Sequence, residues 1–303
     1  MAAASTPTSS PSRRGDDLRS SRGRNAKDRA VLTLLLLATA VSLIVLSVLA
    51  FDILGDGVGR LNIDFLTQYT SRFPDETGIR AGITGTLSLM VLTALMTFPI
   101  GVGAALYLEE FAARNRMTRL LETNINNLAG VPSVIYGLLG LSVFVYVLGF
   151  GRALIAGALT LTLLVMPVVI VAAREALRAV PQEIRSAGLA LGATPLQVAT
   201  RQTFPAAVPG IMTGLILSLS RAVGETAPIL VAGAIFSRRA DNEPWHPFEA
   251  YTAIPIQIYD FVKRPQSEFQ IEVASAAIIV LMAILLLMNS AAIIIRNRYS
   301  RNI

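Results

Sequence analysis

The sequence contains no cysteine and only one histidine, His246, among its 303 residues. Without cysteine the chain forms neither a disulfide nor a thiolate metal site, and a single histidine does not make a metal cluster. Lysine is nearly absent as well, since Lys27 follows an alanine and Lys263 follows a valine. The phosphate-binding loop of ATP-cleaving proteins usually reads Gly-x4-Gly-Lys-Ser/Thr, which neither lysine matches. We therefore expect that the chain is not an enzyme and binds no cofactor itself.

Charged residues are scarce throughout the chain. They make up 15% of it, against about 25% in a typical soluble domain, while hydrophobic residues make up 53%. This composition favours an integral membrane protein. The formal net charge of +6 comes from basic residues that lie beside the apolar runs, as membrane orientation requires. The positive charge therefore predicts contact with membrane lipid and no nucleic-acid partner.

Six apolar stretches are each long enough to cross a bilayer, for which about 20 residues of helix suffice. Five of them carry no charge, and the sixth, residues 202–237, contains Arg221 and Glu225. We therefore predict an all-α integral membrane protein with six transmembrane helices. The five uncharged stretches are 31–51, 81–108, 123–151, 153–173 and 273–295.

The first stretch, 31–51, is interpreted as an N-terminal transmembrane anchor that the mature chain retains. Its 21 residues exceed the apolar core of a secretory signal peptide, which is about 7–15 residues long. It follows an arm, residues 1–30, that is rich in serine and arginine and shows no apolar periodicity. Such a composition predicts a disordered basic arm.

The distribution of lysine and arginine predicts the orientation of the chain in the membrane. Seventeen of them lie in the arm, in 109–122, in 174–201 and in the C-terminal tail, whereas eight lie in the remaining loops. Because positively charged loops stay in the cytoplasm, we expect both termini there. The loops 52–80 and 238–272 then face outward. The second of them contains an apolar segment, 251–261, which we expect to lie on the membrane or against a partner protein.

The segment between the fourth and fifth spans predicts two short helices joined by a tight turn. Pro181 suits the first position of a helix, and Gly192 suits the left-handed residue that ends it. Thr194 and Gln197 have the spacing of a capping box at the start of the second helix. Pro205 is expected to mark the end of that helix. A short amphipathic pair of this kind lies either in a cleft of a soluble partner or on the bilayer surface.

Residues 186–205 resemble the EAA loop of ABC importer permeases, which reads Glu-Ala-Ala, three residues, Gly, nine residues, Ile, one residue, Leu-Pro. Ala187, Gly192 and Pro205 fall on its Ala, Gly and Pro positions, whereas other residues replace its Glu and its second Ala. The resemblance implies that this loop binds a separate ATPase and keeps its bend at Gly192. The residues expected at that contact are Ser186, Ala187, Gly188, Gly192, Thr194 and Pro205.

Five stretches, in order, resemble the PstA-type permease family of bacterial phosphate importers. The resemblance covers about residues 80–298 and implies a type I ABC importer permease of six spans in the bacterial plasma (inner) membrane. It also implies a homologous PstC-type permease, a dimer of PstB-type ATPases that uses ATP and Mg, and a periplasmic PstS-type phosphate-binding protein. The stretches are GVGAALYLEEFA (101–112), NINNLAGVPSVIYGLLGL (124–141), REALRAVP (174–181), LSRAVGETAPIL (219–230) and YTAIPIQIY (251–259).

We therefore expect the chain to consist of an arm, an anchor and a permease domain. The permease domain is expected over residues 81–298, with a cytoplasmic coupling loop at 174–205. The loops 52–80 and 238–272 are then periplasmic. Residues 299–303 are expected to form a short cytoplasmic tail.

Arg221 and Glu225 lie four residues apart, on one face of the fifth span. They are either a structural ion pair that fixes helix packing or the lining of a water-filled path. In the second case Arg221 contacts phosphate, because a guanidinium offers planar, two-pronged hydrogen bonding, and Glu225 keeps the ion from being trapped. Ser220 and Thr226 are candidate hydroxyl ligands. Pro228 is expected to kink the same helix.

The segment 124–137 contains three asparagines, a proline and two glycines. It predicts a polar helix start that packs closely through small residues. Contact of Ser133 or Tyr136 with the substrate path is the alternative.

Three other functions remain open. A permease of the same architecture for sulfate or molybdate has the same anion chemistry, and only the resemblance favours phosphate. An ion-coupled secondary transporter would use Glu225 as its proton carrier. A membrane scaffold or sensor would use the acidic loops and the basic arm as interaction surfaces.

Overall fold

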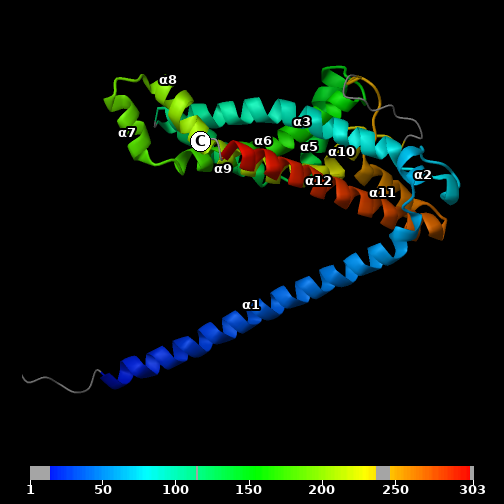
Figure 1. Cartoon of the computed structure of the whole chain (residues 1–303), viewed down its shortest axis with the longest axis horizontal. Coiled ribbons are helices and arrows are strands. Elements are labelled where there is room, and N and C mark those ends of the chain that lie inside the picture. Colours follow the sequence, from blue (N-terminus) through cyan, green and yellow to red (C-terminus); the bar gives the residue numbers. More distant parts are fainter. Residues whose placement is uncertain (1–13, 114, 237–245, 301–303) are drawn as a thin grey trace, which may run out of the picture. The chain divides into compact units, whose positions relative to one another are not determined.

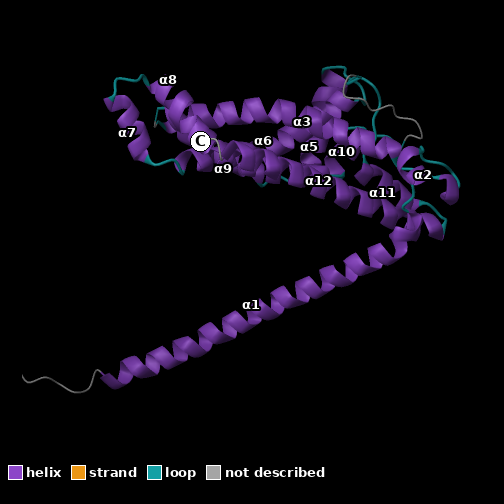
Figure 2. Cartoon of the chain, in the orientation of Figure 1, coloured by secondary structure: helices purple, strands orange, loops and turns teal. Residues whose placement is uncertain are grey.

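The computed structural model describes residues 14–113, 115–236 and 246–300. In these ranges the secondary structure is helical, apart from one isolated bridge between Ala153 and Ala250, as Figure 2 shows. The all-α prediction is thereby confirmed. The helices are α1 (Arg14–Gly57), α2 (Ile63–Thr67), α3 (Arg80–Leu106), α4 (Arg116–Ala129), α5 (Ser133–Gly140), α6 (Leu154–Arg178), α7 (Gln182–Ala190), α8 (Pro195–Val198), α9 (Phe204–Val223), α10 (Ala227–Val231), α11 (Ile254–Lys263) and α12 (Ala274–Ser300).

Short helical turns of other kinds extend or connect these helices. Two are 3₁₀ turns, Val58–Arg60 and Pro74–Glu76, in the segment between α1 and α3. The others are π-helical turns, in which the backbone hydrogen bonds run to the fifth residue back. The π-helical turns are Tyr107–Phe111, Leu141–Val147, Ala199–Thr203 and Phe269–Val273.

The chain divides into two compact units, residues 1–53 and 54–303. The described part of the first unit is α1, whose apolar portion belongs to the candidate span Asp28–Arg60. Because α1 begins at Arg14, the disorder predicted for residues 1–30 is corrected over 14–30, and residues 1–13 lie outside the described part. No proline follows Pro11 in the arm. A helix nucleated in the apolar run therefore extends backward through it at low cost.

Five helices of the described chain are long and apolar enough to cross a membrane, and a bent pair makes a sixth if it counts as one span. The bent pair joins α4 to the helix Ser133–Val147, and their axes differ by 102°. The predicted span 123–151 is therefore not one continuous helix. Pro132 lacks a backbone N–H and disfavours a helical conformation at Val131, which breaks the helix between α4 and α5.

In the second unit, α6 packs between α3 and α9 (Figure 1). In its most apolar window 67% of the residues are buried, against 39% in the spans of α3 and α9 and 6% in that of α12. Glycines bring the helices close together. A Cβ added at Gly214 would lie 2.5 Å from Ala172, and one added at Gly101 would lie 2.9 Å from Val169. Small residues allow such approach within a membrane, so α6 forms the centre of this unit.

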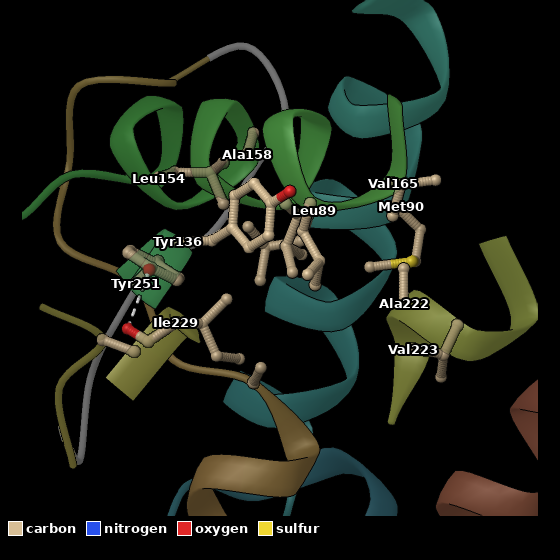
Figure 3. Packing of buried hydrophobic residues seen from close by; sticks show 14 of the residues in the cluster. Leu89, Met90, Tyr136, Leu154, Ala158, Val165, Ala222, Val223, Ile229 and Tyr251 are labelled. Carbon is tan, nitrogen blue, oxygen red and sulfur yellow. Dashed lines mark hydrogen bonds between the residues drawn. The ribbon is translucent and has the colours of Figure 1, made fainter. Parts of the chain in front are cut away.

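A second core lies around α11, at the end of this unit opposite α7 and α8 (Figure 1). The segment 251–261, which we expected on the membrane or against a partner, is instead buried in the chain itself. Its apolar face packs on α3 and α12, because an amphipathic helix hides that face wherever a neighbour offers an apolar surface. The hydroxyl of Tyr251 donates to the carbonyl of Ile229 at 3.3 Å (Figure 3), and burial raises the pKa of that hydroxyl.

Candidate functional site

Arg221 and Glu225 lie at the point where the fifth span breaks. Helix α9 ends at Val223, Gly224 caps it, and α10 begins at Ala227. The kink predicted at Gly224, whose carbonyl Pro228 leaves without a backbone donor, is thus a full break. Pro228 occupies the first turn of α10, where a backbone N–H has no partner within the helix and its loss costs little.

The two charged side chains form the predicted ion pair but differ in exposure. Nε of Arg221 lies 3.5 Å from Oε1 of Glu225. The Glu225 side chain is 16% exposed, whereas the Arg221 side chain is 63% exposed. The guanidinium therefore projects from the surface of this chain, while the carboxylate stays close to it. A pair that only fixed the packing of this chain's own helices would hold both side chains against those helices.

A small cavity lies against the charged pair. Its volume is about 20 Å³, which holds about one water molecule and not a tetrahedral anion of five heavy atoms. The hydroxyl of Tyr136 donates to the carbonyl of Leu128 at 2.8 Å across the bend between α4 and α5, and both residues line the cavity. The remaining walls come from α6 and α9. The lining residues on those helices are Leu164, Val165, Val168, Ser218, Arg221, Ala222 and, just after α9, Glu225.

Both helix breaks therefore meet at this cavity. A Cβ added at Gly137 would lie 2.8 Å from Cα of Pro228, so α5 and α10 touch through this glycine. Tyr136, next to it, lies within the main apolar core shown in Figure 3. Tyr136, the alternative path contact, thus lines the cavity beside the charged pair.

Two predicted hydroxyl ligands are not brought to the cavity. Ser220 faces α12, where its hydroxyl lies within hydrogen-bonding distance of Oδ1 of Asn289 and of the carbonyl of Ile216. Thr226 is partly exposed at the N-terminal end of α10 and does not line the cavity. Ser218 takes the place expected for Ser220. Ser218 lies seven residues, about two helical turns, before Glu225 and therefore on the same face of the helix as the ion pair. This spacing could have identified Ser218 from the sequence.

The loop between α6 and α9 has the predicted local geometry at its turn. Gly192 has φ of +82°, a left-handed conformation that favours glycine. Thr194 and Gln197 form the capping box, with hydrogen bonds of 3.3 and 2.9 Å. Pro181 lies one position earlier than predicted and caps α7. We call the segment Gln182–Val198, which contains α7, the turn and α8, the elbow.

The end predicted for the second short helix at Pro205 is wrong. The π-helical turn Ala199–Thr203 joins α8 to α9, so that Pro195–Val223 is one helix of 29 residues. The N–H of Phe204 donates to the carbonyl of Ala199, five residues back. This wider turn accommodates Pro205, which has no N–H to donate. The elbow is therefore continuous with the helix that carries Arg221.

The six residues predicted to contact an ATPase separate into two groups. Ser186, Ala187, Gly192 and Thr194 are exposed on the elbow. Gly188 is buried against Val198 and Gln202, and Pro205 lies within the long helix. The elbow also exposes four large apolar side chains, since Leu191 is 88%, Leu196 60%, Leu189 50% and Ile184 37% exposed.

A network of charges at the base of the elbow was not predicted. Glu109, just after α3, accepts hydrogen bonds from Nε of Arg178 at 3.0 Å and of Arg174 at 3.4 Å. Arg174 also donates to Glu122 of α4 at 2.5 Å and is 6% exposed. The partners are 52 to 69 residues apart in sequence, so no local pattern indicates them.

Comparisons with known proteins agree with this architecture. Residues 97–302 match the family model described as binding-protein-dependent transport system inner membrane component. The chain is 32% identical to the probable ABC transporter permease protein YqgI of Bacillus subtilis, over 73% of this chain and 75% of that one. It is 36% identical to the phosphate transport system permease protein PstA 1 of Mycobacterium tuberculosis, over 72% of this chain and 70% of that one. Among solved structures, an inward-facing MetNI methionine ABC transporter superposes with a TM-score of 0.59 at 20% identity, over 73% of this chain and 95% of that one.

Proposed function

Because the chain belongs to the family of binding-protein-dependent transport system inner membrane components, we propose that it is the permease subunit of an ATP-driven importer of inorganic phosphate. The observation that carries the proposal is the exposed guanidinium of Arg221 within an apolar span. The names of several relatives at 26–36% identity, which are phosphate transport permeases, favour phosphate as the anion.

The exposed charge of Arg221 within the apolar span limits what can lie against that part of the surface. An ionised side chain facing lipid near the bilayer centre costs about 2.5–3.5 kcal/mol on insertion scales. Arg221 therefore faces either water or another protein. A guanidinium binds phosphate oxygens through two parallel hydrogen bonds, and Glu225 weakens that binding enough for release. The cavity of about 20 Å³ is closed to phosphate, so the path opens by movement and is completed by a second, PstC-type permease.

The elbow is proposed as the contact with a PstB-type ATPase dimer. Its exposed leucines present an apolar surface, and its continuity with α9 carries a displacement directly to Arg221. ATP and Mg then belong to the partner. In this arrangement the elbow and both termini lie in the cytoplasm, and the α11 end meets a periplasmic PstS-type binding protein. The lysine and arginine distribution supports that orientation in the bacterial plasma membrane.

The experiment is uptake of radiolabelled phosphate into proteoliposomes that contain the whole complex, with the binding protein and ATP supplied on their respective sides. We expect uptake that requires ATP and that excess sulfate or molybdate does not reduce. Competition by either oxyanion would assign the same path to that substrate instead. Uptake that depends on an imposed proton gradient and does not require ATP would overturn the proposal in favour of a secondary transporter.

A further inference from the structure

Arg185 of α7 connects the elbow to the ends of two spans. Its Nε and Nη2 donate to the carboxylate of Glu110 at 3.2 and 2.9 Å. Glu110 lies in the π-helical turn Tyr107–Phe111, directly after α3. Nη1 donates to the carbonyl of Val180, and Nη2 to that of Leu177, both at 2.8 Å, where α6 ends. One guanidinium thus holds α3, α6 and α7 together.

This contact is nearly removed from solvent. The Arg185 side chain is 14% exposed and that of Glu110 is 10% exposed. Hydrogen bonds between charged groups are stronger than neutral ones, and the low dielectric of a buried site strengthens them further. The carbonyl end of α6 adds to the attraction, because the C-terminal end of a helix carries partial negative charge.

Few other contacts attach α7 to the spans. Gly188 is the buried residue of α7, and it packs on Val198 and Gln202, which belong to the helix that follows. A polar cavity of about 330 Å³ separates much of the elbow from the end of α3. Besides the short link of residues 179–181 that joins α6 to α7, a displacement of the elbow therefore has two routes into the membrane. One is the continuous helix into α9, and the other is Arg185.

We propose that Arg185 is a positioning residue that transmits displacement of the elbow through Glu110 to α3 and through the Leu177 and Val180 carbonyls to α6. The inference rests on the proposed function. The cavity at Arg221 has walls on both α6 and α9, so its shape depends on how far each of these helices moves when the elbow is displaced. Without Arg185 the elbow moves α9 but displaces α3 and α6 less, and ATP is hydrolysed without passage of the anion.

The test measures phosphate transported per ATP hydrolysed by the complete complex in proteoliposomes. The variants are Arg185→Lys, which keeps the charge and loses the two-pronged geometry, and Glu110→Gln, which lies outside the elbow. We expect the ratio to fall at least about fivefold while the ATP hydrolysis rate stays within about twofold of the native complex. Arg298→Lys, at an exposed position of α12, is the control and should leave the ratio unchanged.

A rescue uses the absence of cysteine from this chain. In the Glu110→Cys/Arg185→Cys permease, a short bismaleimide links the two cysteines before the ATPase is added. The amount of phosphate transported per ATP hydrolysed should then be higher than in the same variant left unlinked.

Three results overturn the inference: a native ratio in both single variants, hydrolysis and uptake falling together in Glu110→Gln, or failure of both variants to assemble. If only the Arg185→Lys variant fails to assemble, the phosphate transported per ATP hydrolysed by the Glu110→Gln variant decides whether the inference holds. A native complex without ATP-dependent uptake would instead overturn the proposed function.

Discussion

Nε of Arg221 lies 3.5 Å from Oε1 of Glu225, yet the arginine side chain is 63% exposed and the glutamate side chain 16%. This asymmetry separates the two interpretations of the pair. An ion pair that served packing alone would hold both side chains against the chain's own helices, whereas the guanidinium projects away from them. A pair on the wall of a path needs the cation to reach the passing anion and the carboxylate to limit how tightly it binds.

Arg221→Lys is expected to reduce phosphate uptake about tenfold or more, since a hydrogen bond to a charged group contributes about 1.5–3 kcal/mol and lysine cannot form the two-pronged contact. The measurement is the initial uptake rate at matched amounts of assembled complex. Arg298→Lys is the control. Uptake of the Arg221→Lys variant within about twofold of native would argue against direct contact with the anion.

Glu225→Gln is expected to lower both the maximal uptake rate and the apparent KM. Removing the carboxylate leaves Arg221 to hold the anion more tightly, so that release becomes slower. Uptake measured over a range of phosphate concentrations, with saturating binding protein, separates the two parameters. An unchanged maximal rate would show that Glu225 does not assist release.

Ser218 and Ser220 lie on opposite sides of α9, with Ser218 at the cavity and Ser220 against α12. Ser218→Leu should fill the cavity beside Arg221 and block uptake. Ser220→Ala removes one hydrogen bond to α12, which contributes about 0.6 kcal/mol on average in membrane proteins, and should leave uptake within about twofold of native. The reverse order of effects would place the path on the α12 side of α9.

Gly192→Ala is expected to weaken binding of the ATPase. An L-residue in the left-handed conformation costs about 1–2 kcal/mol, which shifts the elbow away from the shape that φ of +82° gives it. Gly192→Asn is the control, because asparagine also occurs at this position of helix ends. The measurement is recovery of the ATPase with the purified permease. Equal recovery from both variants would show that the turn at Gly192 is not needed for binding.

Local patterns in the sequence predicted the features that depend on short stretches of chain. Apolar length located the spans, and the Gly192 turn and the Thr194 capping box follow from residue types at fixed spacing. The length of the uncharged stretch does not reveal the bend at Pro132, because a bent pair of helices is as apolar as one straight helix. The continuity through Pro205 depends on a π-helical turn, which has no simple sequence signal. Arg185 and Glu110 are 75 residues apart, so only the fold brings them together.

The most direct test of the account is whether position 221 faces water within the membrane. The absence of cysteine from the chain lets a single Arg221→Cys variant report this, with Leu287→Cys, 70% exposed on α12, as the control that we expect to face lipid. A small cationic methanethiosulfonate reagent is applied to the assembled complex, and the rate of modification is measured at each position. The account predicts rapid modification at 221 and slow modification at 287. Equally slow modification at both positions would contradict it.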